Sequence, residues 1–352
     1  MSHIHLLCGV RRAVVLAVLG LSGLLACSAA GGSPGAAVAV LRIDAPVHEP
    51  IWSDHARALF ALTDNGRIAK IASSERSGAQ PTARTTLSAL FPDVGENLVT
   101  GATEAVVYLP QPKLGQLATL SDADLRQVGA AQAGPSPSFL ALDSGSEHLL
   151  ALSADRSTVT PIDLHDKTVL PSQYVHAGPD AELHGAKRGR RIDYYVTGPR
   201  GIAHYRGSPG SVQNEGEIGI TAERAVGDPT KSSRIYVAEK GTDRLLALDS
   251  KRTGDGLEVV AQANLGEPVR YLGVDETRLY AATEHTLVVL ETNSFEGYHD
   301  QTFPIVTSID FKSALQGEVE NAPLSGLAVG PDKVYLTLKG QPYVVSVAKP
   351  SI

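Results

Sequence analysis

Carboxylate, amide and guanidinium side chains recur in this sequence, together with one indole at Trp52, at positions that could bring them to one site. The carboxylates and amides are Glu49, Asn97, Glu182, Glu223, Glu267 and Asn321. Oxygen ligands of this kind suit Ca²⁺ or Mg²⁺. The same residue types are also typical of solvated loops, and nothing in their spacing separates a metal site from a charged surface. We favour the solvated loop, and the metal site stays an alternative.

The elements that would position these residues come from an internal repeat. Its clearest copy, residues 234–250, is a strand, a polar turn containing Gly241, and a second strand ending at Asp249, which is the pattern of a β-hairpin. Six similar hairpins occur elsewhere. The steps between equivalent points are 47, 43, 44, 42, 44 and 55 residues, counted over Leu59, Val106, Leu149, Asp193, Ile235, Leu279 and Val334.

Seven units of 40–50 residues are typical of a propeller with a four-stranded sheet in each blade. The sequence therefore predicts an all-β protein, a seven-bladed β-propeller over residues 38–352. Strands such as 137–142, 268–273 and 323–329 precede the hairpins and should line the central channel. We expect the N-terminal strand, about 38–43, to join the last blade and close the ring, because this hides two exposed sheet edges.

The strands predicted to line the channel, or their first residues, carry the candidate ligand-binding residues: Trp52, Glu182, Glu223, Arg224 and Arg270. The two arginines could hold an anionic ligand through bidentate contacts. Alternatively, Arg224 pairs with Glu223 and Arg270 with Glu267. We favour pairing, because an unpaired charge in a narrow channel is costly.

The first residues have the pattern of an export signal. Arg11 and Arg12 precede a short apolar run that ends at Ala26, and Cys27 follows. A basic start, a short apolar core and a small final residue are typical of a signal peptide. Residues 24–27, Leu-Leu-Ala-Cys, resemble the bacterial lipobox. This resemblance implies a signal peptide over 1–26, lipidation of Cys27, and a Gly/Ser/Ala-rich tether over 27–37; an ordinary signal peptide is the alternative.

Composition narrows the classes of partner. The net charge is −7 and there is no basic stripe, so we expect no nucleic-acid partner. Neither a zinc-protease HExxH motif nor a phosphate-binding P-loop occurs. After removal of Cys8 with the signal peptide, Cys27 would be the only thiol, which excludes an intramolecular disulfide in the mature chain. We expect no cofactor and a monomer.

Residues 234–249 resemble the repeat of YVTN-type propellers, with Tyr236-Val-Ala-Glu239 opening the hairpin and Leu246-Ala-Leu-Asp249 closing it. Poorer copies begin at Tyr280 and Tyr335. Together with the lipobox, the Ala/Gly/Val-rich composition is similar to that of envelope lipoproteins of high-GC Gram-positive bacteria, such as mycobacteria. The resemblance implies the fold and says little about activity, since propellers host many functions.

Three functions remain open at this stage. The first is a membrane-anchored binding or scaffold module on the extracytoplasmic face, with an envelope protein or a small molecule as its ligand. The second is a lactonase- or hydrolase-type enzyme with a divalent metal in the channel. The third is a structural partner in an envelope complex. We rank them in this order because no catalytic motif is recognised.

Overall fold

The computed structural model describes residues 38–351 apart from 75–81, 102–103, 144–147, 176, 186–190, 231–232 and 252. The signal peptide, the tether and Cys27 lie outside these residues. Almost all regular structure in the described part of the chain is β-strand, with three short 3₁₀ turns, η1 (Pro112–Leu114), η2 (Lys312–Ala314) and η3 (Gly317–Val319). No helix among the described residues is long and apolar enough to span a bilayer.

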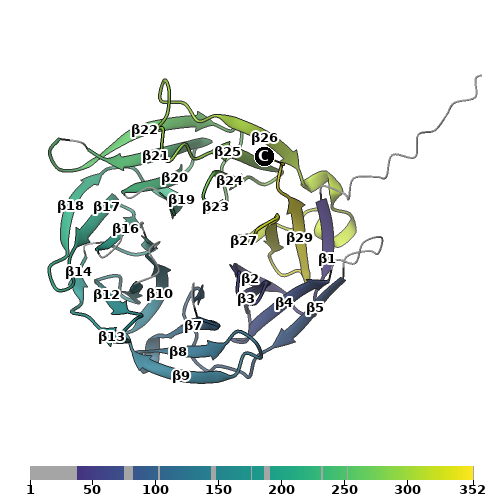
Figure 1. Cartoon of the computed structure of the whole chain (residues 1–352). Helices are drawn as coiled ribbons and strands as arrows, with labels where there is room; N and C mark the ends of the chain where they lie inside the picture. Colours follow the sequence, from purple (N-terminus) through teal and green to yellow (C-terminus); the bar gives the residue numbers. More distant parts are fainter. Residues whose placement is uncertain are drawn as a thin grey trace, which may run out of the picture. The chain divides into compact units, whose positions relative to one another are not determined.

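Seven antiparallel sheets stand around a central axis as the blades of a propeller (Figure 1). The strands of each blade are given from the innermost strand outward. Blade 1 consists of β2 (Val47–Ser53), β3 (Ala58–Thr63), β4 (Ile68–Ser74) and β5 (Thr82–Leu87), and blade 2 of β6 (Val99–Thr100), β7 (Val106–Gln111), β8 (Gln116–Ser121) and β9 (Gln127–Gln132). Blade 3 consists of β10 (Pro137–Leu142), β11 (His148–Ser153), β12 (Thr158–Asp163), β13 (Thr168–Val169) and β14 (Gln173–Tyr174), and blade 4 of β15 (Glu182–Gly185), β16 (Ile192–Gly198), β17 (Gly201–Gly207) and β18 (Gln213–Ile218). The others are blade 5 with β19 (Ala222–Gly227), β20 (Arg234–Glu239), β21 (Arg244–Ser250) and β22 (Leu257–Asn264); blade 6 with β23 (Tyr271–Val274), β24 (Arg278–Ala282), β25 (Thr286–Glu291) and β26 (Ile305–Asp310); and blade 7 with β27 (Leu324–Val329), β28 (Lys333–Leu338), β29 (Tyr343–Ala348) and β1 (Val38–Arg42).

Blade 7 closes the ring as predicted. Its outer strand is the N-terminal β1, which pairs antiparallel with β29 from Val38 opposite Val347 to Arg42 opposite Tyr343. The prediction of seven blades, each built from four antiparallel strands, is confirmed. Blade 3 varies the pattern, because its outer edge is split into β13 and β14, which both pair with β12. Pro171 lies in the gap between them and has no N–H to continue the ladder.

The core consists of apolar layers between blades, and the strand sequences show why. On β20, Tyr236 and Ala238 pack toward blade 6, while Ile235 and Val237 pack toward blade 4. Successive side chains of a strand point to opposite faces, so a strand covered on both faces reads as a continuous apolar run. The described residues form one such layer at each of the seven interfaces between neighbouring blades.

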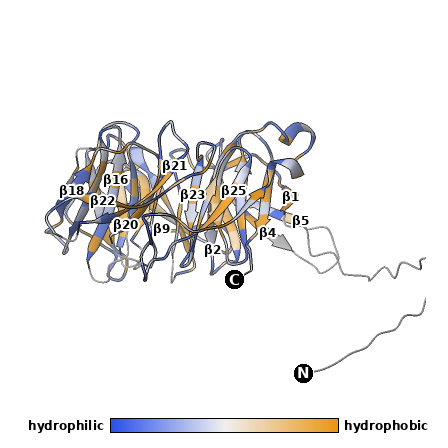
Figure 2. Ribbon diagram, turned by 90° about the horizontal axis from the view of Figure 1, so that it is seen from above, coloured by the Kyte–Doolittle hydropathy of each residue, from blue (hydrophilic) through white to orange (hydrophobic). Residues whose placement is uncertain are grey.

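The ring has two distinct ends. We call the end at which every innermost strand begins the front end; the turns between the second and third strands lie there too. The back end carries the loops between the third and fourth strands. It also carries the start of β1 at Val38 and the end of β29, since these residues pair. Figure 2 views the ring from the side, with the C-terminus at its back end.

The closing strand offers a test of the ring. Leu41 of β1 is 2% exposed and packs in the layer between blades 7 and 1. We expect Leu41→Ala to lower the free energy of unfolding by about 2–4 kcal/mol, because a buried cavity replaces the side chain. Denaturant unfolding of the purified protein measures this change.

Arg42, the exposed neighbour on the same strand, is the matched control. Arg42→Ala should change the free energy of unfolding by no more than about 0.5 kcal/mol. Equal effects of the two substitutions would contradict the packing of β1 into the ring.

Candidate functional site

The central channel contains a cavity of about 320 Å³, and each of the seven blades contributes to its wall. Polar and apolar atoms contribute about equally to the exposed wall, and the apolar side chains include Leu98, Phe139, Leu140 and Leu327. The polar lining residues gather toward the front end, and they are Glu49, Asn97, Glu182, His184, Arg224 and Tyr271. A small cavity that combines apolar side chains with a few polar groups is typical of a ligand site.

The first charge pair at this mouth joins blades 4 and 5. The Arg224 guanidinium donates from Nη1 to Oε1 of Glu182 over 2.7 Å, and it also stacks over the Tyr271 ring at 4.8 Å. Burial raises the pKa of Glu182, and the charge of Arg224 opposes this rise. Their side chains keep 33% (Arg224) and 25% (Glu182) exposure, so a ligand can reach both.

A second charge pair joins blade 3 to the segment before β6. Arg156 donates from Nη2 to both carboxylate oxygens of Glu96, each at 2.6 Å, and the Ser138 hydroxyl donates to Glu96 Oε1. The Asn97 side chain likewise makes structural hydrogen bonds, to the backbone of blade 3. Its side-chain amide donates to the Leu140 carbonyl and accepts from the Leu140 N–H, both at 2.8 Å.

Within the described part of the chain, Glu49 is the carboxylate at the mouth that has no arginine of its own. It lies in a bulge of β2, where the pairing with β3 shifts between His48 and Ile51. Its φ of 46° is a strained conformation for a side chain of this size. The bulge packs closely on Gly326 of blade 7, and a Cβ atom on residue 326 would overlap Pro50.

The electrostatics of Glu49 follow from this placement. Burial raises the pKa of Glu49 to about 7; Arg224 lowers it, while Glu182 and Glu96 raise it further. Near neutral pH the Glu49 carboxyl group is therefore partly protonated. His184, which also lines the cavity, stays neutral, because burial and then the Arg224 charge lower its pKa to about 3.

Of the five candidate ligand-binding residues, Glu182 and Arg224 meet in the cavity, and the other three lie elsewhere. Trp52 is not in the cavity wall: it stacks on Tyr335 at 5.4 Å, between blades 1 and 7, and donates its indole N–H to Asp54. Glu223 occupies a bulge of β19, opposite no residue of β20. Arg270 is exposed, just before β23.

The predicted ion-pair partners were wrong. Arg224 pairs with Glu182 rather than with its neighbour Glu223, and Glu267 pairs with His285 at 2.9 Å rather than with Arg270. The bulge that sets Glu223 apart and the closeness of blades 4 and 5 favour the distant partner over the adjacent one.

Three of the six candidate metal ligands, Glu49, Asn97 and Glu182, line the cavity, and Glu223, Glu267 and Asn321 do not. Within the described part of the chain, no group of three or more His, Cys, Asp or Glu side chains has the geometry of a metal site.

Sequence reasoning missed Glu96, Arg156 and Tyr271. Glu96 directly precedes the candidate Asn97, and Tyr271 directly follows the candidate Arg270, so an extension of each candidate by one residue would have found both. Arg156 lies in the turn between β11 and β12. A turn arginine has no signal of its own, but these turns share the front end with the starts of the innermost strands.

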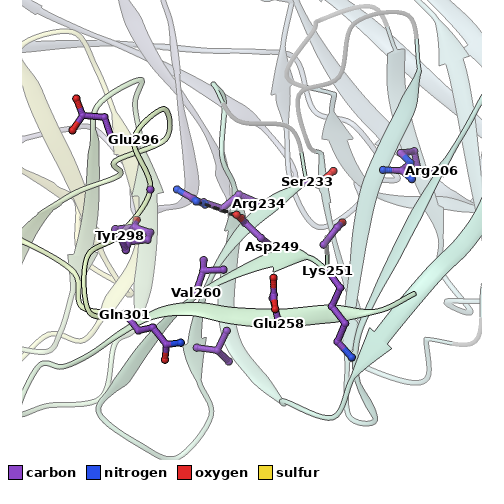
Figure 3. A pocket seen from close by; sticks show the side chains of 13 residues that line it. Arg206, Ser233, Arg234, Asp249, Lys251, Glu258, Val260, Glu296, Tyr298 and Gln301 are labelled. Carbon is purple, nitrogen blue, oxygen red and sulfur yellow. Dashed lines mark hydrogen bonds and ion pairs between the residues drawn. The ribbon is translucent and has the colours of Figure 1, made fainter. Parts of the chain in front are cut away.

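A second hollow, of about 560 Å³, lies at the back end between blades 4, 5 and 6 (Figure 3). Its floor is the buried Arg234, which donates to both oxygens of Asp249, at 2.8 and 3.0 Å. Arg234 also donates to the Thr292 carbonyl and stacks over Tyr298 at 4.9 Å. These contacts tie the long loop of blade 6 to blade 5.

Comparisons with known proteins bear on the fold. No family model matches the chain, and no curated protein matches its sequence. Kuenenia stuttgartiensis hydrazine synthase matches it with a TM-score of 0.62 at 12% identity, over 88% of this chain and 97% of that one. Virginiamycin B lyase from Staphylococcus aureus matches with a TM-score of 0.60 at 10% identity, over 89% and 99%. The likeness is one of fold. A function for this chain has to be argued from its own channel residues.

The raised pKa of Glu49 predicts a pH-dependent stability. The pKa of Glu49 is about 7 in the folded protein, against 4.5 for a solvated glutamate. The contribution of Glu49 to the free energy of unfolding is therefore full below pH 4.5 and is lost as the pH rises through 7. Glu49→Gln removes this loss. We expect the variant to gain on the order of 1–3 kcal/mol relative to the wild type between pH 5 and pH 8, measured by denaturant unfolding at each pH.

Glu223→Gln is the matched control, since it makes the same change outside the cavity. It should keep the pH dependence of the wild type. A Glu49→Gln variant whose stability follows the wild type at every pH would show that Glu49 is solvated rather than buried.

Proposed function

We propose that this protein is a lipid-anchored, extracytoplasmic binding module, and that it takes a small amine-bearing solute at the front end of its channel. The observation that carries the binding site is Glu49, a carboxylate of the cavity wall that has no arginine of its own among the described residues. The anchor rests on residues 24–27, which resemble the lipobox.

The charges at the mouth favour a cation. Three carboxylates, Glu49, Glu96 and Glu182, face two guanidinium groups, Arg156 and Arg224, which leaves one negative charge when all five are ionised. Each arginine already holds one carboxylate, so an anionic ligand would have to displace Glu96 or Glu182. An ammonium group can pair with Glu49 and displace no existing partner.

The walls favour an apolar part in the same molecule. Below the charged mouth, the side chains of Leu98, Phe139 and Leu327 line the cavity, and burial of apolar surface there adds to the affinity. The volume of about 320 Å³ is near the lower limit for small-molecule sites. This points to a solute with an alkyl or aromatic group next to its amine.

Three probes with the same carbon skeleton test the proposal: n-butylammonium, butyrate and 1-butanol. We expect the full-length protein to bind only n-butylammonium, with an affinity that rises from pH 6 to pH 8 as Glu49 loses its proton. Glu49→Gln should weaken this binding by about tenfold or more, which is the effect of losing one charged hydrogen bond. Titration calorimetry measures both effects.

Glu223→Gln again serves as the control and should bind the amine as the wild type does. Equal binding of butyrate, or amine binding that does not respond to Glu49→Gln, would contradict the proposed amine site. A tightly held divalent cation that is lost in Glu49→Gln would instead favour the metal-dependent hydrolase.

The anchor has its own test. We expect the mature protein to begin at Cys27 with the added mass of its lipid, and we expect Cys27→Ala to move the protein from the membrane to the soluble fraction. Peptide mass spectrometry and cell fractionation measure these outcomes. Cys8→Ala is the matched control, because Cys8 would leave with the signal peptide. An unmodified Cys27 in the mature protein would contradict the anchor.

A further inference from the structure

One phenylalanine at the back end is almost fully exposed. Phe295 keeps 87% of its surface in contact with solvent, in the loop between β25 and β26. Isolated apolar residues are common on protein surfaces, so exposure alone assigns no role. The surroundings of Phe295 are unusual, however, because nearby residues of the same loop are buried: Thr292 is 2% exposed, Ser294 6% and Phe303 2%.

The loop is fixed to the neighbouring blade. The Ser294 hydroxyl donates to Asp228 Oδ2 over 2.6 Å, and Arg234 donates to the Thr292 carbonyl over 3.0 Å. Tyr298 packs edge-on against Phe303 at 4.9 Å. Figure 3 shows Tyr298 close to Arg234 beside the back-end hollow. The fold therefore presents Phe295 from an ordered loop, which lowers the entropy lost when the ring is buried by a partner.

Two further apolar residues belong to the same end of blade 6. Ile305 and Val306 open β26 and are 54% and 38% exposed. Together with Phe295 they are exposed apolar residues at this end of blade 6, and we call these three residues the Phe295 patch. Lys251 and Glu258 border the nearby hollow, and Glu296 follows Phe295 directly. This mixture of charges gives no strong attraction for either sign, so contact through the patch should be apolar.

The position at which the chain enters the ring indicates which partner the Phe295 patch meets. The described chain begins at Val38, at the back end of blade 7, and blade 7 adjoins blade 6. The eleven residues 27–37 precede it, and even fully extended they span only about 38 Å. A lipid on Cys27 would therefore keep Val38, at the back end, within about 38 Å of the bilayer.

We propose that the back end of the propeller rests on the membrane surface, with Phe295 inserted among the lipid headgroups. The inference rests on the anchor in the proposed function. Phenylalanine is among the apolar side chains that peripheral proteins bury at the boundary of headgroups and acyl chains, and a second apolar contact adds to the hold of a lipid chain. In this orientation the mouth of the channel, at the front end, faces away from the membrane and stays open to solutes.

The experiment places a tryptophan at each end of the ring in the full-length lipidated protein. Phe295→Trp reports on the back end. Leu114→Trp is the matched control, since Leu114 is 52% exposed in the front-end turn between β7 and β8. Each variant is reconstituted in phosphatidylcholine vesicles with and without bromine on the acyl chains, and the emission of wild-type Trp52 is subtracted.

We expect the emission of the tryptophan at position 295 to shift to the blue on vesicles and to be quenched by the brominated lipid. The effect should persist in high salt, because the contact is apolar. The tryptophan at position 114 should show neither change. Quenching at position 114 equal to that at 295, or none at 295 in vesicle-bound protein, would overturn the proposal.

Two controls distinguish a failure of the proposed membrane contact from a missing lipid anchor and from self-association. The mass of the N-terminal peptide is measured on the same sample, so a protein without lipid on Cys27 contradicts the anchor and this inference together. A blue shift at position 295 that grows with protein concentration in the absence of vesicles would show that a second copy covers the patch, which also overturns the proposal.

Discussion

The structure depends on the pairing of β1 with β29. A blade alone would expose apolar faces on both sides, and each face is buried only against the next blade. Closure by β1 supplies the outer strand of blade 7 and completes the layer between blades 7 and 1, in which Leu41 packs. The channel follows from this closure, because only a complete ring brings all seven innermost strands around one axis.

Closure also creates the candidate site. Glu49 comes from blade 1, Glu182 from blade 4 and Arg224 from blade 5. The bulge that carries Glu49 packs against Gly326 of blade 7, so its strained conformation depends on the contact between the first and last blades. In the low dielectric of the channel, two arginines balance two of the three carboxylates among the described residues, and Glu49 is the carboxylate left over. The proposed membrane contact assigns the opposite end of the ring a separate role.

The sequence predicted the fold well because the repeat is local. The innermost strand of blade 3 was predicted at residues 137–142, where β10 lies, and the closing strand was predicted within one residue. The site was predicted only in part. Glu182 and Arg224 were found because strand starts converge on the axis, but local pairing gave Arg224 the wrong partner. Trp52 was misplaced because its strand is bulged, and its ring packs between blades. Arg156 was missed because turn residues follow no apolar period.

The central claim is that Glu49 is a partly buried carboxylate that can pair with a cationic ligand. Its titration is the most direct measurement. Carbon NMR of full-length protein labelled at the glutamate carboxyl carbons, with Glu49→Gln to assign the signal, gives its pKa. The account predicts a pKa of about 7, which falls when n-butylammonium is added. A pKa close to 4.5, the value of a solvated glutamate, that does not change with the amine would contradict it.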